Sequence, residues 1–248
     1  MSLVSIVIPA RNEEKNVPYT IEKILRAFDE EGIDVEILIV NDGSTDRTAE
    51  VTKDLSDKDK RVRLVTNSGP HGIGNAIRRG LKVFHGDVVI IAMADSSDNP
   101  KDMISYVRKI EEGYECCFGT RWVKEAKVKN YPFHKLLLNR MVNWWICIMF
   151  GIKYNDTTNA FKCYSRNVIQ GIKPVLSHHF NITVELPLKA IVRGYKYTVI
   201  PTDWRQRKFG HTSLKIKEMG SRYLFIIFYV FFEKLLCKED YQKRMQDE

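Results

Sequence analysis

The stretch Val88–Pro100, VVIIAMADSSDNP, predicts both a central strand and the place where a ligand would bind. Five apolar residues open it, and two acids, Asp95 and Asp98, follow. A continuous apolar run with β-branched residues is typical of a strand buried on both faces, as in a parallel sheet. Acids just beyond such a strand lie where open α/β sheets bind ligands, and they can hold a divalent cation on phosphate. The same acids could instead be turn and capping residues before a helix that begins near Pro100.

The segments around this stretch alternate between apolar strands and amphipathic helices. The alternation predicts an α/β fold with a parallel sheet and right-handed crossovers. We expect strands at Ser5–Pro9, Val35–Val40, Val62–Thr66, Val88–Ala92 and Glu115–Thr120, and helices at Val17–Phe28, Arg47–Leu55, Asn75–Phe84 and Lys101–Glu111.

The pattern changes after Arg121. Residues 121–135 are basic and weakly periodic, which indicates a loop. Beyond them we expect helices at Lys135–Phe150 and Asn181–Arg193 and strands at Phe161–Tyr164 and Tyr197–Pro201. Because no linker-like stretch interrupts the chain, we expect one catalytic domain over residues 1–215 and an amphipathic helical tail over residues 216–248.

Composition favours an anionic partner. The net charge is +8 and the pI is about 9.1, and basic residues gather in the ranges 121–140 and 205–222. Nucleic acid is a poor candidate because no nucleic-acid module is recognisable and the basic residues flank carboxylates. The five cysteines show no zinc or redox spacing, and no signal peptide precedes the first strand, so we expect a cytoplasmic protein.

Two apolar segments approach the length of a membrane span without reaching it. They are WWICIMFGI at residues 144–152 and YLFIIFYVFF at residues 223–232. Each could be a buried helix or a helix that lies in the membrane interface. The aromatic content and basic flank of the second favour the interface, which predicts peripheral association with the cytoplasmic face of a membrane.

Polar clusters follow four of the predicted strands, and in a parallel sheet these ends share one edge. The pairs are Arg11 and Glu13, Asp42 and Asp46, Gly72 and Gly74, and Asp95 and Asp98. Asp42 could accept hydrogen bonds from a ribose or a base, or it could form a local turn with its NDGS neighbours. The dinucleotide fingerprint is absent after the first strand and a Walker A motif is absent throughout, which argues against a dehydrogenase and a P-loop kinase.

The motifs SIVIPARNEE, IVNDGSTDRT and ADSSDNP resemble those of family 2 glycosyltransferases with the Rossmann-like GT-A fold. Later motifs are similar to those of dolichol- or polyprenyl-phosphate mannose synthases. They are FGTRW (118–122), NRMVN (139–143), DTTNAFKCYSR (156–166) and RKFGHTS (207–213). The resemblance covers roughly residues 3–215 and implies a mostly parallel sheet flanked by helices.

The resemblance also implies a GDP- or UDP-linked sugar as donor, inverting transfer, and Mg²⁺ or Mn²⁺ on the diphosphate. The metal would rest on Asp95 and Asp98, because Met93 stands where the family usually has its first Asp. The positions implied in binding the nucleotide sugar are Pro9, Arg11, Glu13, Val40, Asp42, Ala94, Asp95, Arg121, Arg207 and Ser213. Ser213 replaces a lysine that is usual in the family.

The acceptor implied by the resemblance is a polyprenyl phosphate, which is ionised at neutral pH and needs cations rather than a general base. Arg140 fits that task, while the Arg121 position is implied at the donor diphosphate or sugar. Asp156 could orient the acceptor, take a proton or support an arginine. If the acceptor is a sugar or lipid hydroxyl, Asp156 is the candidate base. Met93 leaves a third alternative, a non-catalytic protein that binds nucleotide sugars.

Overall fold

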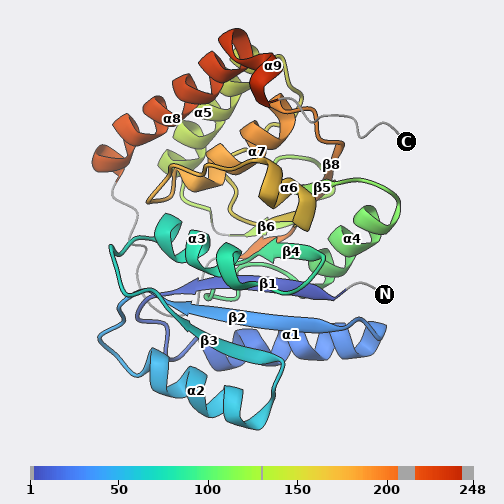
Figure 1. Ribbon diagram of the computed structural model, residues 1–248, viewed down its shortest axis with the longest axis vertical. Coiled ribbons are helices and arrows are strands. Elements are labelled where there is room, and N and C mark those ends of the chain that lie inside the picture. The colour runs from blue at the N-terminus through green and yellow to red at the C-terminus, as the bar shows by residue number, and fades with distance from the viewer. Residues whose placement is uncertain (1–2, 130, 206–215, 242–248) are drawn as a thin grey trace.

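The structure, a computed structural model, describes residues 3–129, 131–205 and 216–241 (Figure 1). In chain order its elements are β1 Val4–Ala10, α1 Val17–Glu31, β2 Val35–Asn41, α2 Thr48–Lys58, β3 Val62–Thr66, α3 Ile73–Val83, β4 Val88–Ile91, α4 Pro100–Glu111, β5 Cys116–Thr120, β6 Val128–Lys129, α5 Phe133–Phe150, β7 Lys162–Ser165, α6 Arg166–Gly171, α7 Ile182–Val192, β8 Tyr197–Pro201, β9 Trp204–Arg205, α8 Ile216–Leu236 and α9 Lys238–Tyr241.

A seven-stranded sheet runs through the described part of the chain in the order β3-β2-β1-β4-β7-β5-β8. The predicted mostly parallel α/β fold is confirmed, since β1 to β4 are mutually parallel and β8 is parallel to β5. One strand departs from this parallel arrangement. Strand β7 lies between β4 and β5 and is antiparallel to both.

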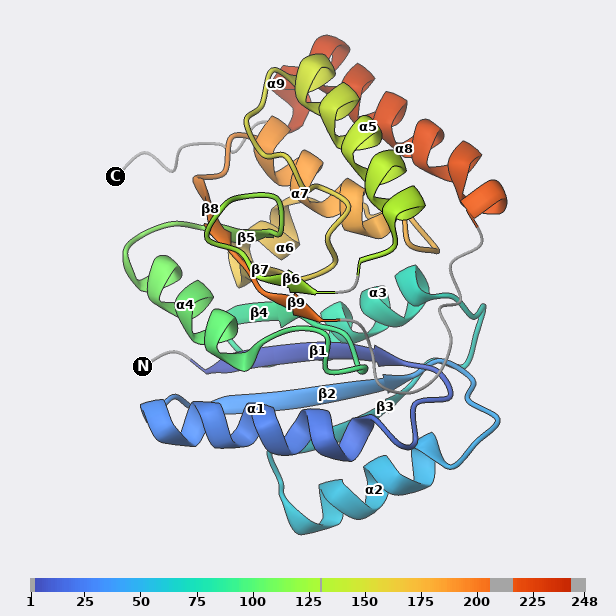
Figure 2. The same ribbon diagram turned by 180° about the vertical axis from the view of Figure 1, so that it is seen from behind.

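Helices cover both faces of the sheet, as its apolar strands require. Every residue of β1 and β2 is buried. Helices α1 and α4 pack on one face with Ile6, Ile8 and Ile37, and α3, α6 and α7 pack on the other with Val7 and Leu38 (Figures 1 and 2). This two-sided burial explains why these strands read as unbroken apolar runs.

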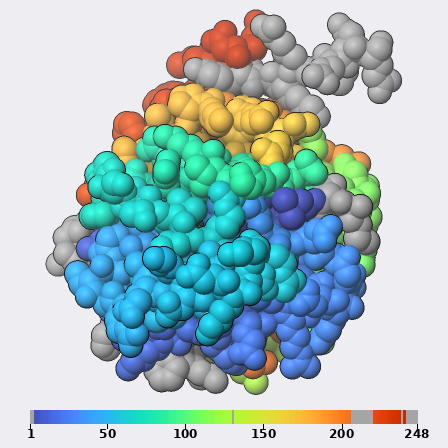
Figure 3. All heavy atoms as spheres, turned by 60° about the horizontal axis from the view of Figure 1, so that its bottom comes forward, coloured from blue at the N-terminus to red at the C-terminus, as the bar shows by residue number. Residues whose placement is uncertain are grey.

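A third apolar cluster joins α5, α7 and α8 outside the sheet. Ile146, Leu188 and Ile227 are among its members, and each is at most 1% exposed. Helix α8 is longer than its apolar sequence suggested, and its inner side packs on α5 and α7. In the space-filling view the blue to teal N-terminal elements occupy the near end of the molecule, and the red C-terminal helices lie beyond the opposite end (Figure 3). Among the described residues, no helix is both long and apolar enough to cross a bilayer.

The first turn of α3 packs directly on the backbone of residues 177–179. A Cβ atom on Gly74 would lie 2.5 Å from the carbonyl carbon of His178 and 2.6 Å from the nitrogen of His179. These contacts are with backbone, so a side chain cannot be accommodated by a change of rotamer. The approach fixes the loop before α3 against the segment before α7.

We therefore expect Gly74→Ala to lower the free energy of unfolding by about 1–3 kcal/mol through overpacking. Gly220→Ala is the matched control, because Gly220 is also helical and nothing lies within 4 Å of its added Cβ. Higher helix propensity should raise the stability of that variant by up to about 1 kcal/mol. Urea unfolding of both variants measures the difference, and equal stability would contradict the close approach.

Candidate functional site

The carboxyl ends of β1, β2 and β4 meet at one edge of the sheet, as the sequence predicted. Pro9 pairs with Val40 across β1 and β2, and both side chains are buried. The amide of Ala92, just beyond β4, donates to the carbonyl oxygen of Val7 at 3.1 Å. The structure therefore places Pro9 and Val40, two predicted nucleoside contacts, side by side at this edge.

The loop after β1 is fastened to the start of α2. The amide of Glu13 donates to Thr48 Oγ1 at 2.8 Å, and the amide of Glu14 donates to Asp46 Oδ2 at 3.2 Å. Hydrogen bonds from Thr48 outweigh the opposing effect of burial and lower the pKa of Asp46. Arg11 is exposed beside this joint. Asp46 therefore holds two loops of the edge together and also accepts from the first amide of α2, that of Thr48, at 3.0 Å.

Asp42 is a buried carboxylate that fastens the next loop. Its Oδ1 accepts from Asn67 Nδ2 at 2.7 Å and lies 3.2 Å from His71 Nδ1, and its Oδ2 accepts from the amide of Gly72 at 2.8 Å. The local turn is made by its neighbour Asn41, whose Oδ1 accepts from the amide of Ser44 at 3.1 Å. The turn alternative for Asp42 is therefore wrong, because the side chain points across to the loop before α3.

A cavity of about 570 Å³ opens on the far side of His71. The residues that line it come from the loop before α3, the segment before α7 and the start of α8, and include His71, Asn75, His178, Asn181, Arg222 and Phe225. Within the described residues the buried Oδ1 of Asn181 has no hydrogen-bond partner. Gly43 has a φ of +67°, and its missing side chain leaves room for the His71 ring, which a Cβ would approach to 2.6 Å. The sequence placed the loop from His71 to Gly74 at this edge but did not predict the contact of His71 with Asp42.

The two acids after β4 sit in a tight turn. Asp95 is 8% exposed, and its Oδ1 accepts from the amide of Ser97 at 3.1 Å. Asp98 folds back, and its Oδ2 accepts from the amide of Met93 at 2.9 Å. Burial raises the pKa of Asp98 to about 7, with a further contribution from Asp95 and an opposing one from Arg121. Asp98, Asp95 and Arg121 are thus close enough to act on one another electrostatically.

This turn offers a small donor set for a metal ion. Within the described residues no group of three or more His, Cys, Asp or Glu side chains has an arrangement suited to metal binding. A pair of carboxylates is a donor set that fits Mg²⁺, which keeps several waters and uses few protein ligands. Asp95 and Asp98 would hold the ion, and their role as ligands stays a prediction.

Arg121 and Asp156 form a buried ion pair at the end of β5. Arg121 Nε donates to Asp156 Oδ2 and Nη2 donates to Oδ1, each at 2.8 Å, and the Arg121 amide also donates to Oδ2 at 3.0 Å. The side chains are 10% and 0% exposed. Burial opposes the charge of the guanidinium, but Asp156 raises the pKa of Arg121 above its ordinary value. The geometry matches the third sequence alternative for Asp156, support of an arginine.

Aromatic rings surround this arginine and connect it to the metal corner. The Arg121 guanidinium lies 5.3 Å from the Trp122 ring and 5.6 Å from the Tyr131 ring, and Tyr131 contacts Trp204 at 5.1 Å between centroids. Trp204 belongs to β9, and the next amide, that of Arg205, donates to the Ser97 carbonyl at 3.3 Å. Predicted site residues Arg207 and Ser213 lie outside the described residues.

Two asparagines of α5 hold the Asp156 loop in place. Asn143 Oδ1 accepts from the amide and the hydroxyl of Thr157 at 2.6 and 2.7 Å. Asn139 accepts from Trp122 Nε1 at 3.0 Å and donates to Thr158 Oγ1 at 2.7 Å. Their i, i+4 spacing in NRMVN was the sequence signal for this shared face. Arg140, between them, is exposed, and its Nη1 donates to the carbonyl oxygen of Asn155, next to Asp156, at 3.5 Å.

Lys162 buries its amine beneath the same loop. Its side chain donates to the carbonyl oxygens of Thr157, at 3.0 Å, and of Asn159. Burial lowers the pKa of Lys162 to about 7, although the nearby charge of Asp156 acts in the opposite direction. Sequence reasoning did not single out this lysine.

This burial predicts a pH-dependent stability. Between pH 7 and about 10.4, the unfolded chain holds a proton on Lys162 that the folded chain lacks, so stability should rise by up to about 1.4 kcal/mol per pH unit. Lys162→Met should lack this rise. Urea unfolding at pH 7 and pH 9 measures both proteins, and the same pH dependence in each would contradict the prediction.

Comparisons with known proteins agree with this arrangement. Residues 5–171 match a family model described as Glycosyl transferase family 2. A polyprenol monophosphomannose synthase from Mycolicibacterium smegmatis is 27% identical over 83% of this chain and 78% of its own length. A dolichol-phosphate mannosyltransferase from Pyrococcus furiosus is 29% identical over 86% of this chain, which spans only 60% of that relative.

Solved structures show the same fold at low sequence identity. Glucosyl-3-phosphoglycerate synthase from Mycobacterium tuberculosis superposes with a TM-score of 0.69 at 17% identity, over 98% of this chain and 80% of that one, in a complex with Mn²⁺, uridine diphosphate and phosphoglyceric acid. Its complex with phosphoglyceric acid gives the same TM-score over 94% of this chain and 80% of that one. Together with the match over residues 5–171, the described site residues lead to one assignment: the chain belongs to glycosyl transferase family 2.

Proposed function

We propose that this glycosyltransferase moves a sugar, with inversion, from a GDP- or UDP-linked donor to a polyprenyl phosphate at a membrane surface. The two curated relatives carry names for this class of reaction, although their identities to this chain are only 27% and 29%. The observation that carries the choice of acceptor is the bidentate pairing of Asp156 with Arg121.

Because of that pairing, Asp156 is poorly placed to act as a general base. Both of its oxygens accept hydrogen bonds from Arg121, and its side chain has no exposed surface. A hydroxyl acceptor needs a carboxylate or imidazole within hydrogen-bond reach to take its proton. A phosphate oxygen already carries negative charge at neutral pH, so its attack needs no proton transfer. The geometry therefore favours a phosphate acceptor over a hydroxyl.

The donor would lie along the edge formed by β1, β2 and β4. The backbone at Pro9 and Val40 would border the nucleoside, and Arg11, Glu13 and Asp42 would supply polar contacts. Asp42 is held for this by the amide of Gly72 and the side chain of Asn67. The backbone at Ala94 and the carboxylate of Asp95 would then border the diphosphate.

In the transfer, an acceptor oxygen forms a bond to the anomeric carbon as the bond from that carbon to the diphosphate breaks on the opposite side. Negative charge moves onto the leaving diphosphate. A Mg²⁺ or Mn²⁺ ion bound at Asp95 and Asp98 would neutralise part of it. Arg121 would contribute through Nη1, which takes no part in the pair with Asp156. Exposed Arg140 would receive the acceptor phosphate, and Arg207 and Ser213 stay predicted donor contacts.

The acceptor class is tested by offering the full chain matched pairs of acceptors. With GDP- and UDP-sugars and Mg²⁺ or Mn²⁺, we expect transfer to a polyprenyl phosphate and none to the corresponding polyprenol. Thermal stabilisation reports donor binding separately. Transfer to the polyprenol would favour a hydroxyl acceptor. Metal-dependent stabilisation by a nucleotide sugar, without transfer to either acceptor, would favour a non-catalytic binder and would fit the loss of an acid at Met93.

Asp156→Asn tests how that carboxylate acts. If Asp156 positions Arg121, the variant should lose about 100-fold in kcat, keep the shape of its pH–rate profile, and combine non-additively with Arg121→Lys. If Asp156 is instead a general base, the variant should also lose the acidic limb of the pH–rate profile. Asp54→Asn, which removes an exposed acid on α2, is the matched control and should leave activity unchanged.

A further inference from the structure

The cavity beside His71 has no role in the proposed transfer, and its chemistry differs from that of the donor edge. Its volume of about 570 Å³ is in the range of small-molecule sites. Among the described residues that line it, none is an aspartate or a glutamate. The polar ones include the histidines His71, His178 and His179 together with Asn75, Asn181 and Arg222. A lining with a guanidinium and no carboxylate suits an anion rather than a cation.

Hydrogen bonds between its elements hold the walls of this cavity in place. The amide of Asn75, in the first turn of α3, donates to the carbonyl oxygen of His178 at 3.2 Å, and Asn75 Oδ1 lies 2.8 Å from His178 Nδ1. From α8, the hydroxyl of Tyr223 donates to the carbonyl oxygen of Phe180 at 3.2 Å. Figures 1 and 2 show the starts of α3 and α8 on the same side of the molecule. The cavity therefore has fixed walls before any ligand binds.

Two acids stand behind these walls, and both are already paired within the protein. Glu185 accepts from the amides of Leu176 and Ser177, each at 2.7 Å, and lies 2.8 Å from Lys189 Nζ. Asp42 accepts from Asn67 and from the amide of Gly72. Their negative charges are thus offset by partners outside the cavity, and they do not cancel the positive charge of Arg222.

The start of α3 adds a second attraction for an anion. This 11-residue helix begins without a side-chain cap, since its N-cap is Gly72, and Asn75 of its first turn lines the cavity. The positive end of the helix dipole therefore lies at the cavity wall. Arg78, one turn further along, places Nη1 3.5 Å from His178 Nδ1. A phosphate group is the anion that a helix start and a guanidinium bind together.

Asn181 asks for a different group on the same ligand. Its side chain is 5% exposed, and among the residues that the structure describes its Oδ1 accepts no hydrogen bond. It is the N-cap residue of α7, yet its side chain makes no capping hydrogen bond. A buried amide oxygen without a donor costs about 1–3 kcal/mol. An ionised phosphate cannot supply that donor, whereas a hydroxyl can.

We propose that this cavity binds a polyol phosphate. Its phosphate group contacts Arg222 and the start of α3, one of its hydroxyls donates to Asn181, and its carbon skeleton lies against Leu176 and Phe225, which also line the cavity. The same chemistry is found in soluble glycerol 3-phosphate and in the headgroup of phosphatidylglycerol. Binding is measured without nucleotide, divalent cation or acceptor, so its outcome is separate from that of the proposed sugar transfer.

The test is calorimetric titration of the full chain, in EDTA, with glycerol 3-phosphate and with inorganic phosphate. We expect saturable binding of both, with glycerol 3-phosphate tighter by about threefold to tenfold because of its hydroxyl contact. Arg222→Gln, a change at an exposed side chain, should weaken both by about tenfold or more. Asn181→Ala should abolish the preference for glycerol 3-phosphate and leave the affinity for inorganic phosphate unchanged.

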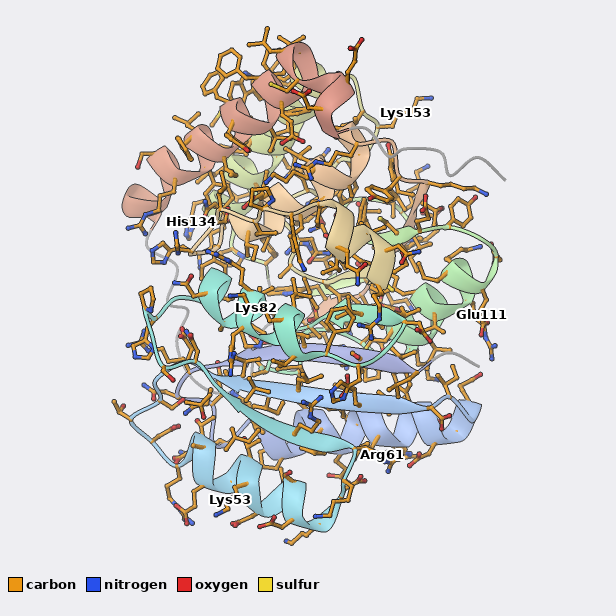
Figure 4. The ribbon with its side chains drawn as sticks, viewed as in Figure 1. Lys53, Arg61, Lys82, Glu111, His134 and Lys153 are labelled. Carbon is orange, nitrogen blue, oxygen red and sulfur yellow. The ribbon has the colours of Figure 1, made fainter. Side chains whose placement is uncertain are left out.

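Matched variants show whether the phosphate is held in this cavity. Arg79→Gln and Lys53→Gln remove the same charge as Arg222→Gln, but neither residue lines the cavity, and Lys53 is on α2 at the far end of the molecule (Figure 4). Both should bind as the natural chain does, and so should Arg140→Gln, which changes the proposed acceptor arginine. Equal weakening by Arg79→Gln and Arg222→Gln would overturn the cavity as the site.

A third probe separates the two sources of the ligand. Dihexanoylphosphatidylglycerol, below the concentration at which it forms micelles, offers the headgroup on a soluble lipid. Binding of this lipid that is at least tenfold tighter than binding of glycerol 3-phosphate, and that Arg222→Gln weakens, would assign the site to a lipid headgroup. Tighter binding of glycerol 3-phosphate would assign it to a soluble metabolite. Absence of saturable binding for all three probes would overturn the proposal.

Discussion

The pairing of Arg121 with Asp156 is the interaction on which the rest of the site depends. It joins the end of β5 to the loop after α5, and it buries both charges almost completely. Removing one partner of such a pair typically costs about 3–5 kcal/mol, because the other charge is left uncompensated. Replacing both by apolar residues often costs little, so the pair is better explained as a means of holding a charge in place. Thr157, bound by Asn143, and the carbonyl groups held by Lys162 keep its loop from shifting.

The N-terminal half of the sheet could be predicted from sequence because its signals are local. Strands buried on both faces read as apolar runs, and each is followed by an amphipathic helix, so strand and helix limits come out within a few residues. Strand β7 could not be placed this way. Its four residues say nothing about direction, which is set by the path of the chain through α5 and back to the gap between β4 and β5. The pairing of Ile90 with Cys163 is a tertiary contact that no window of sequence contains.

The same distinction between local signals and tertiary contacts applies to the candidate site. Asp42, Asp95 and Asp98 could be named because each closely follows a strand whose end must lie at the ligand edge. Their hydrogen-bond partners could not be named from sequence. Asn67 and His71 reach Asp42 from another loop, and Asp98 accepts from an amide in its own turn, that of Met93. For Asp156 the sequence allowed three roles. Only the position of Arg121 separates them, because a carboxylate that accepts both arms of a guanidinium has neither oxygen turned to a substrate.

Hydrophobic periodicity tells which side of a helix is apolar but not what covers that side, and α5 shows the consequence. Its apolar residues are compatible with a core helix or an interfacial one. In the structure the buried side holds Asn143 as well as Ile146, while Trp144 on the outer side is exposed. Buried asparagines need partners, and these come from the Asp156 loop, so the inner side of α5 is committed to the site. Helix α5 is therefore linked to Arg121 through Thr157 and Asp156. The helix with an exposed apolar outer side and the arginine that would stabilise the leaving group are thereby parts of one connected unit.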